Sequence, residues 1–212
     1  DTLDKIEKSY NSKLTGGIII NPKNGEIYAM AISPTFNLNN FQKEKDPLIY
    51  SNPLVESVYE MGSIIKPLAM AAGLDAGVVK ASSTYDDKGS LTLNGKTISN
   101  FDGKGRGPGT SMQEVLNQSL NTGMTYVMQR LGQELFPKYM MSYGLGEETG
   151  IDLPNETYGL VENLKSPREI ELATASFGQG IAVTPIETVR ALATLGNGGY
   201  LITPHLVKEV HY

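Results

Sequence analysis

Two short sequence patterns carry side chains suited to acyl transfer: a Ser-x-x-Lys at Ser63 and Lys66, and a Ser-x-Asn at Ser119 and Asn121. A serine hydroxyl becomes an effective nucleophile when a base takes its proton, and a lysine serves as that base if desolvation lowers its pKa. The chain contains no second Ser-x-x-Lys. A capping serine beside an incidental lysine is the alternative interpretation, but a lone lysine in an apolar helix needs a reason.

The element that must position Ser63 and Lys66 is a helix expected over residues 63–74. Lys66 is its only charged residue, and apolar residues cover every face, as is typical of a buried helix. Pro67 is tolerated only where its missing N–H needs no partner, so the helix must begin close to Ser63. Ser63 is therefore expected at the N-terminal tip, where free N–H groups favour an oxyanion, with Lys66 one turn on along the same face.

The Ser-x-Asn triplet falls in a break between two expected helices. A capping box, Ser111-Met112-Gln113-Glu114, opens a short helix to residue 118, and a second helix runs over 122–132. In an extended tripeptide the first and third side chains point the same way, so Ser119 and Asn121 are expected to face one cleft. A turn or a helix cap is the alternative, because the same triplet also occurs at residues 9–11.

Composition excludes several classes of function. The net charge of −5 and the pI near 5.1 argue against nucleic acid or an anionic membrane surface as the main partner. Cysteine is absent, so there is no disulfide framework and no Cys-based metal site. His205 and His211 are six residues apart and make a poor metal pair, and no Gly-x-Ser-x-Gly elbow supports a Ser-His-Asp hydrolase. No metal and no cofactor are predicted.

The remaining elements follow from local signals. A β-branched run, an Asn-Gly turn and an alternating return strand predict a hairpin over 17–31. A polar helix over 2–13, a long ordered loop over 34–58 and small strands over 82–109 are expected around it. A further helix is expected over 167–176, and Thr184-Pro185-Ile186-Glu187 is a second capping box that opens a helix to about residue 195.

The order of these motifs resembles the transpeptidase domain of penicillin-binding proteins, in particular the class B, monofunctional branch of this penicilloyl serine transferase family. The resemblance covers nearly the whole chain from Gly16 onward. It is carried by the Tyr-Glu-Met-Gly-Ser-Ile-Ile-Lys-Pro run at 59–67, the Ser-Leu-Asn triplet, Phe-Gly-Gln-Gly at 177–180 with its continuation to 185, and segments 143–146, 149–154 and 195–200. Met61 stands where this branch usually has proline.

The resemblance implies an α+β fold: an α/β sandwich of the β-lactamase/transpeptidase-like type with an all-helical subdomain over about 63–196. Residues 1–212 would form a partial transpeptidase domain, with the hairpin 17–31 as part of its sheet. The family's third motif, Lys-Thr-Gly or Lys-Ser-Gly, is missing, since Lys96-Thr97-Ile98 lacks the glycine and precedes the Ser-x-Asn triplet. The chain is therefore expected to end before that strand, with an incomplete sheet and little activity of its own.

The resemblance also implies roles for the two motifs. Ser63 is the expected nucleophile, Lys66 the general base, Ser119 the proton relay to the leaving amine, and Asn121 the residue that holds Lys66 and the substrate amide. The backbone N–H of Ser63 supplies half of the oxyanion hole. The expected substrate-binding residues are Gly62, Ser63, Asn121, Gly178 and Gln179.

The implied reaction is the D,D-transpeptidation that cross-links peptidoglycan stem peptides ending in D-Ala-D-Ala, and β-lactams would acylate Ser63 as substrate mimics. The implied location is the bacterial cell envelope, on the extracytoplasmic face of the cytoplasmic membrane. There the complete protein is expected to be membrane-anchored and to belong to a division or elongation complex.

Three alternatives share these motifs. A D,D-carboxypeptidase differs only in using water as the acceptor. A serine β-lactamase of class A also needs a suitably spaced glutamate to activate the deacylating water, and neither 162–165 nor 169–172 has that spacing. The third alternative is a non-catalytic β-lactam sensor, which the intact Ser-Lys-Ser-Asn set makes less favoured.

Overall fold

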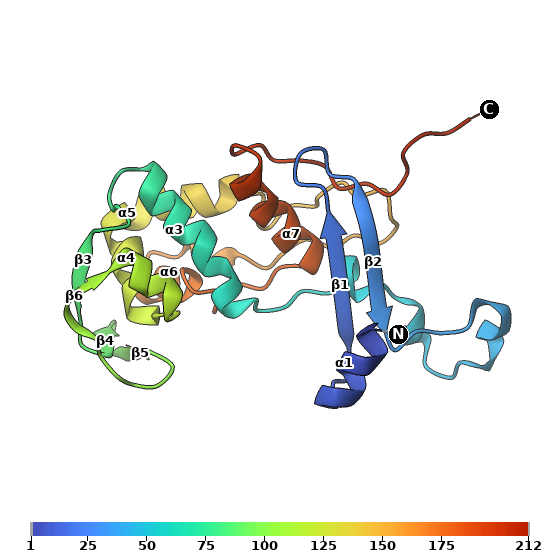
Figure 1. Ribbon diagram of the computed structural model, residues 1–212, viewed down its shortest axis with the longest axis horizontal. Coiled ribbons are helices and arrows are strands. Elements are labelled where there is room, and N and C mark those ends of the chain that lie inside the picture. The colour runs from blue at the N-terminus through green and yellow to red at the C-terminus, as the bar shows by residue number, and fades with distance from the viewer. Residues whose placement is uncertain (1, 212) are drawn as a thin grey trace.

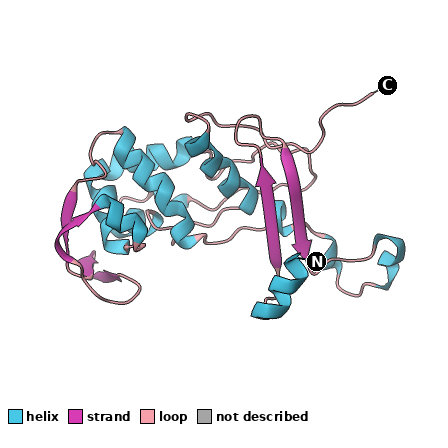
Figure 2. Ribbon diagram, viewed as in Figure 1, coloured by secondary structure: helices cyan, strands magenta, loops and turns pink. Residues whose placement is uncertain are grey.

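A computed structural model describes residues 2–211. Most of its helices lie in one group that carries two small sheets at its far end, while a β-hairpin stands on the opposite side, next to α7 (Pro185–Ala193) (Figure 1; Figure 2). The helix α1 (Thr2–Tyr10) packs at the open end of the hairpin.

The hairpin pairs β1 (Thr15–Ile20) with β2 (Ile27–Ser33) in antiparallel register, with Thr15 opposite Ser33. The prediction of a hairpin over 17–31 is confirmed, and each end extends two residues further. Residues 34–58, expected as a loop, also contain two short 3-10 helices (Leu38–Lys43 and Pro47–Tyr50) and one turn of helix, α2 (Pro53–Glu56).

The core surrounds two helices that pack against each other, α3 (Lys66–Asp75) and α5 (Asn121–Ser142). Gly132 interrupts α5 with a left-handed φ of 80°, which corresponds to the break expected after residue 132. Two shorter helices, α4 (Met112–Asn117) and α6 (Glu169–Ala175), flank this pair. The buried side chains that fill the spaces between them include Leu68, Met124, Met128, Phe136 and Leu172.

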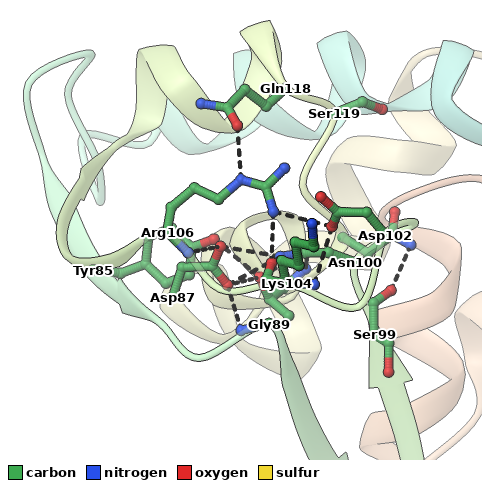
Figure 3. Close-up of polar contacts among 12 residues, drawn as sticks. Tyr85, Asp87, Gly89, Ser99, Asn100, Asp102, Lys104, Arg106, Gln118 and Ser119 are labelled. Atoms are coloured by element: carbon green, nitrogen blue, oxygen red, sulfur yellow. Dashed lines mark hydrogen bonds and ion pairs between the residues drawn. The ribbon is translucent and has the colours of Figure 1, made fainter.

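The helical part is not wholly helical. It carries two two-stranded antiparallel sheets, β3 (Thr84–Asp87) with β6 (Gly107–Ser111), and β4 (Ser90–Leu93) with β5 (Lys96–Ser99). These are the small strands expected over 82–109, and the Asn94-Gly95 turn joins the second pair. They matter for function because β5 ends beside the Ser-x-Asn triplet (Figure 3).

Within residues 2–211 each sheet has two strands, so the mixed fold has a small sheet, as the sequence predicted. An apolar cavity of about 440 Å³ lies beside β1, lined by residues of β1, α2 and α7. The helix α7 begins with the predicted capping box: Thr184 and Glu187 each bond the backbone N–H of the other. None of the helices in the described part is long and apolar enough to cross a membrane.

Candidate active site

Ser63 lies in a 3-10 turn (Gly62–Ile65) that leads directly into α3. Pro67 occupies the first turn of α3, where a missing N–H costs no hydrogen bond, which is why the helix can begin at Lys66. The predicted helix tip is therefore present, with the tighter 3-10 geometry in its first turn. Ser63 is exposed, whereas Lys66 is only 2% exposed.

The buried Lys66 ammonium is held by neutral oxygens. Its Nζ donates to the Ser119 carbonyl oxygen at 2.7 Å, to Ser119 Oγ at 2.9 Å and to Asn121 Oδ1 at 2.8 Å. Burial lowers the pKa of Lys66 from 10.5 to about 8, because removal from water disfavours the charged form. A substantial fraction of this lysine can therefore be neutral near pH 8 and accept a proton.

Ser63 reaches Lys66 through Ser119. The two serine hydroxyls lie 3.0 Å apart, and the hydrogen bonds of the described residues include no direct bond between Ser63 Oγ and Lys66 Nζ. Ser63 and Lys66, expected one turn apart on the same helix face, are thus connected by a chain of three groups, Ser63 Oγ, Ser119 Oγ and Lys66 Nζ. A hydroxyl both donates and accepts, so these hydrogen bonds can reverse direction when Lys66 is neutral. The proton of Ser63 can then pass through Ser119 to the Lys66 amine.

The Ser-x-Asn triplet reaches Lys66 with a different backbone from the one expected. Ser119 has a left-handed φ of 53°, Leu120 is extended, and Asn121 is already the first residue of α5. The interpretation as an extended tripeptide is therefore wrong. The left-handed turn brings both the carbonyl and the hydroxyl of Ser119 onto Lys66, which an extended strand would not do.

Contacts on both sides fix the orientation of the Asn121 amide. Its oxygen accepts from Lys66, and its nitrogen donates to the Ser99 carbonyl at the end of β5, at 3.0 Å. An asparagine NH₂ group has two hydrogens, so one N–H is left for a substrate carbonyl.

The segment 177–183 packs against the residues that precede Ser63. The Gly62 N–H donates to the Gly178 carbonyl at 3.1 Å, and the Gly180 N–H donates to Glu60 Oε1 at 2.7 Å. A Cβ on Gly178 would lie 2.1 Å from the Gly62 oxygen. Gly178, expected among the substrate-binding residues, thus contacts the backbone that carries the serine.

A cavity of about 360 Å³ opens beside Asn121, the one catalytic candidate among its lining residues. Two of the expected substrate-binding residues, Asn121 and Gln179, line it, whereas Gly62 and Gly178 meet each other at the Ser63 turn. Two cationic residues, Lys96 on β5 and Arg168 just before α6, also line the cavity, and Arg168 pairs with Glu171 at 3.1 Å. No group of three or more metal-ligating side chains occurs in residues 2–211.

Two buried residues that support the Ser-x-Asn triplet belong to no sequence motif. Asp87 and Asn100 are both buried and lie next to each other (Figure 3). Both also bond Thr122. Asn100 follows Asp87 by 13 residues and precedes Thr122 by 22 residues, and no motif of fixed spacing links the three. The one usable sequence signal is Leu120, which precedes α5 and has no side-chain oxygen with which to cap it.

Comparison with protein families decides the relationship. The family model described as the penicillin-binding protein transpeptidase domain matches residues 15–212. The chain belongs to this family.

Curated proteins of similar sequence support the assignment. Stage V sporulation protein D of Bacillus subtilis strain 168 is 38% identical over 209 residues, which cover 98% of this chain and 32% of that protein. The peptidoglycan D,D-transpeptidase MrdA of Acinetobacter baumannii is 30% identical over 215 residues, covering 92% of this chain and 32% of that protein. The chain thus spans about a third of the length of these relatives.

Solved structures of related proteins have the same fold. Penicillin-binding protein 3 of Mycobacterium tuberculosis, in complex with aztreonam, superposes with a TM-score of 0.89 at 25% identity, over 97% of this chain and 46% of that one. A putative peptidoglycan glycosyltransferase from Atopobium parvulum gives 0.86 at 30% identity, over 96% of this chain and 47% of that one. The predicted family and fold class are confirmed.

Proposed function

We propose that this chain forms the acyl-transfer site of a peptidoglycan D,D-transpeptidase, with Ser63 as nucleophile and Lys66 as general base. The observation that carries the proposal is the chain of contacts from Ser63 Oγ through Ser119 Oγ to a buried lysine with a lowered pKa. A nucleophile, a base within reach and a third group that orients the base are the features expected of covalent catalysis. The names of relatives such as MrdA support the same reaction.

In the first half-reaction Ser63 Oγ attacks the carbonyl carbon of the penultimate D-alanine. Its proton passes through Ser119 to neutral Lys66, and the backbone N–H of Ser63 donates to the resulting oxyanion. The bond to the terminal D-alanine nitrogen then breaks. Ser119 gives that nitrogen a proton and regains one from Lys66, so D-alanine leaves as an amine and an ester remains on Ser63.

In the second half-reaction the amine of a neighbouring stem peptide attacks the ester. The same proton path runs in reverse: the amine loses a proton through Ser119 to Lys66, and Ser63 Oγ receives one from Lys66 through Ser119 as it leaves. The products are a new amide cross-link and free enzyme. A β-lactam enters the first half-reaction in the same way, but its ring opens without releasing a fragment that would make room for the acceptor.

The cavity beyond Asn121 would hold the donor stem peptide. The free N–H of Asn121 is placed to donate to a peptide carbonyl next to the scissile bond. Lys96 and Arg168 line this cavity together with one acidic residue, Glu171, so its charged side chains carry a net positive charge in a chain whose net charge is −5, which suits a carboxylate-bearing peptide. Because cross-linking of stem peptides takes place in the cell wall, we place the protein in the bacterial cell envelope, on the extracytoplasmic face of the cytoplasmic membrane. We propose that it works there as an anchored member of a division or elongation complex.

The experiment that tests this function incubates the protein with a peptide ending in D-Ala-D-Ala and a D-amino acid as acceptor amine, with mass spectrometry of the products. Transpeptidation predicts a product that carries the acceptor in place of the terminal D-alanine and that disappears with Ser63→Ala. Hydrolysis alone would indicate a carboxypeptidase, many turnovers of nitrocefin would indicate a β-lactamase, and stoichiometric acylation without turnover of peptide would indicate a sensor.

A further inference from the structure

A buried carboxylate lies behind the Ser-x-Asn turn (Figure 3). Asp87 is 1% exposed, and its oxygens accept from the side-chain amide of Asn100 at 3.0 and 3.1 Å, from the Gly89 and Arg106 N–H groups at 3.0 Å each, and from Thr122 Oγ1 at 2.8 Å. Burial raises the pKa of Asp87, but these donors outweigh it and leave the pKa below its ordinary value. Asp87 is therefore an anion that orders the groups around it.

Asn100 connects this anion to the start of α5. Its amide nitrogen is fixed by Asp87 and by the Lys104 carbonyl, so its oxygen must face the helix, where it accepts from the Thr122 backbone N–H at 3.2 Å. The first N–H groups of a helix have no partner within the helix, and Leu120 at the cap position cannot provide one. Asn100 supplies that cap from a distant part of the chain.

Thr122 makes the connection twice. Its hydroxyl has one hydrogen, which goes to the charged Asp87 at the shorter distance, and Tyr85 OH, 2.9 Å away, donates to the same hydroxyl. The residue before Thr122 is Asn121, whose amide donates to the carbonyl of Ser99, the residue before Asn100. Two adjacent residues on β5 and its exit thus hold two adjacent residues of α5.

The turn that these contacts hold is strained. Ser119 adopts a φ of 53°, a conformation that residues with a Cβ keep only when the surrounding structure fixes them in it. If the start of α5 is released, the turn can relax toward an ordinary conformation. Ser119 Oγ and Asn121 Oδ1 then lose their aim at Lys66.

We propose that Asp87 and Asn100 are positioning residues for acyl transfer: through Thr122 they hold the 119–121 turn in the geometry that presents Ser119 Oγ and Asn121 Oδ1 to Lys66. The effect on rate rests on the function proposed above, whereas the effect on Lys66 can be measured without any reaction. A cluster that serves stability alone would lower the melting temperature of the protein when disrupted and leave Lys66 as it is.

The test titrates Lys66 by NMR in protein labelled with ¹³C at lysine Cε, with the Lys66 signal identified by its loss in Lys66→Met. Asn100→Ala removes the cap. Thr122→Val replaces the hydroxyl with a methyl of similar size, and Thr122→Ser is its matched control, because it keeps the hydroxyl. The neighbours of Lys66 Nζ are Ser119 O, Ser119 Oγ and Asn121 Oδ1, all uncharged, so a change in its pKa reports on these contacts.

We expect Asn100→Ala and Thr122→Val to lower the pKa of Lys66 from about 8 to about 7, because the ammonium loses a hydrogen-bond acceptor. Thr122→Ser should leave this pKa unchanged. The rate of penicillin labelling at Ser63 should fall at least about ten-fold in the same two variants.

The proposal would be overturned if folded Asn100→Ala and Thr122→Val keep the Lys66 pKa and the labelling rate of the parent protein, even if both variants melt at a lower temperature. If Asn100→Ala does not fold, the comparison of Thr122→Val with Thr122→Ser tests the proposal. If Ser63 of the parent protein carries no penicillin even after several hours of exposure, the proposed function fails, while the Lys66 titration still tests the positioning.

Discussion

Gly178 packs so closely against Gly62 that adding one methyl group should slow catalysis in addition to lowering stability. Its φ of 77° is left-handed, and a Cβ built there would lie 2.1 Å from the Gly62 oxygen and 2.7 Å from the Gly62 nitrogen. Real Cβ contacts are essentially never shorter than 3.0 Å, so Gly178→Ala must push the Gly62 backbone about 0.9 Å away. Gly62 directly precedes Ser63, and a misplacement of about 1 Å costs on the order of 100-fold in rate.

The matched control is Gly77→Ala. Gly77 also has a left-handed φ, 68°, but no atom lies within 4 Å of the Cβ position, and it follows the far end of α3. Both substitutions place a Cβ in a left-handed conformation, which costs about 1–2 kcal/mol of folding stability. Only Gly178→Ala should also slow the labelling of Ser63.

The assay compares the second-order rate constants for labelling by a fluorescent penicillin, with thermal melts of all three proteins. We expect labelling of Gly178→Ala to be about 100-fold slower than in the parent and that of Gly77→Ala to stay within about three-fold. Equal labelling of Gly178→Ala and the parent would show that the contact between segment 177–183 and the Ser63 turn does not position the serine.

Three further predictions follow from named contacts. Acylation should increase with pH through about 8 rather than 10.5, since Lys66 must lose its proton before it can accept one, and Lys66→Ala should slow acylation about 10²- to 10⁴-fold; a rate independent of pH from 6 to 10 would argue against this base. Arg168→Met should weaken binding of a carboxylate-bearing stem peptide about two- to five-fold in calorimetry. Lys165 lies outside the cavity, so Lys165→Met should bind this peptide as the parent does, and Arg168→Met should not change the affinity for a peptide whose carboxylate is amidated. Glu187→Gln should destabilise the fold by about 1–3 kcal/mol, a melting temperature several degrees lower, because the buried carboxylate accepts from the backbone N–H groups of Gly146, Gly159 and Thr184; an unchanged melt would contradict this.

The sequence was sufficient wherever local chemistry decides the structure. Pro67 and the apolar run after it place Ser63 at a helix tip, and the Thr184–Glu187 capping box and the Asn-Gly hairpin turn formed as predicted. The motif order identified the family, which the family model confirmed.

Sequence reasoning failed where distant segments decide. The left-handed Ser119 is favoured by no local signal and depends on Asp87 and Asn100, which a sequence pattern does not link to it. The substrate-binding role of Gly178, implied by the resemblance, stays a prediction. Its contact with Gly62, which the sequence did not indicate, depends on how two segments more than a hundred residues apart approach each other.

The central claim is that Ser63 is the nucleophile, and the most direct measurement is the position of a covalent adduct. The protein is exposed to benzylpenicillin for several hours, digested and sequenced by tandem mass spectrometry, in parallel with Ser63→Ala. The account predicts an adduct on the peptide that contains Ser63, located on the serine itself, and none in Ser63→Ala. An adduct on any other residue, or undiminished labelling of Ser63→Ala, would contradict it.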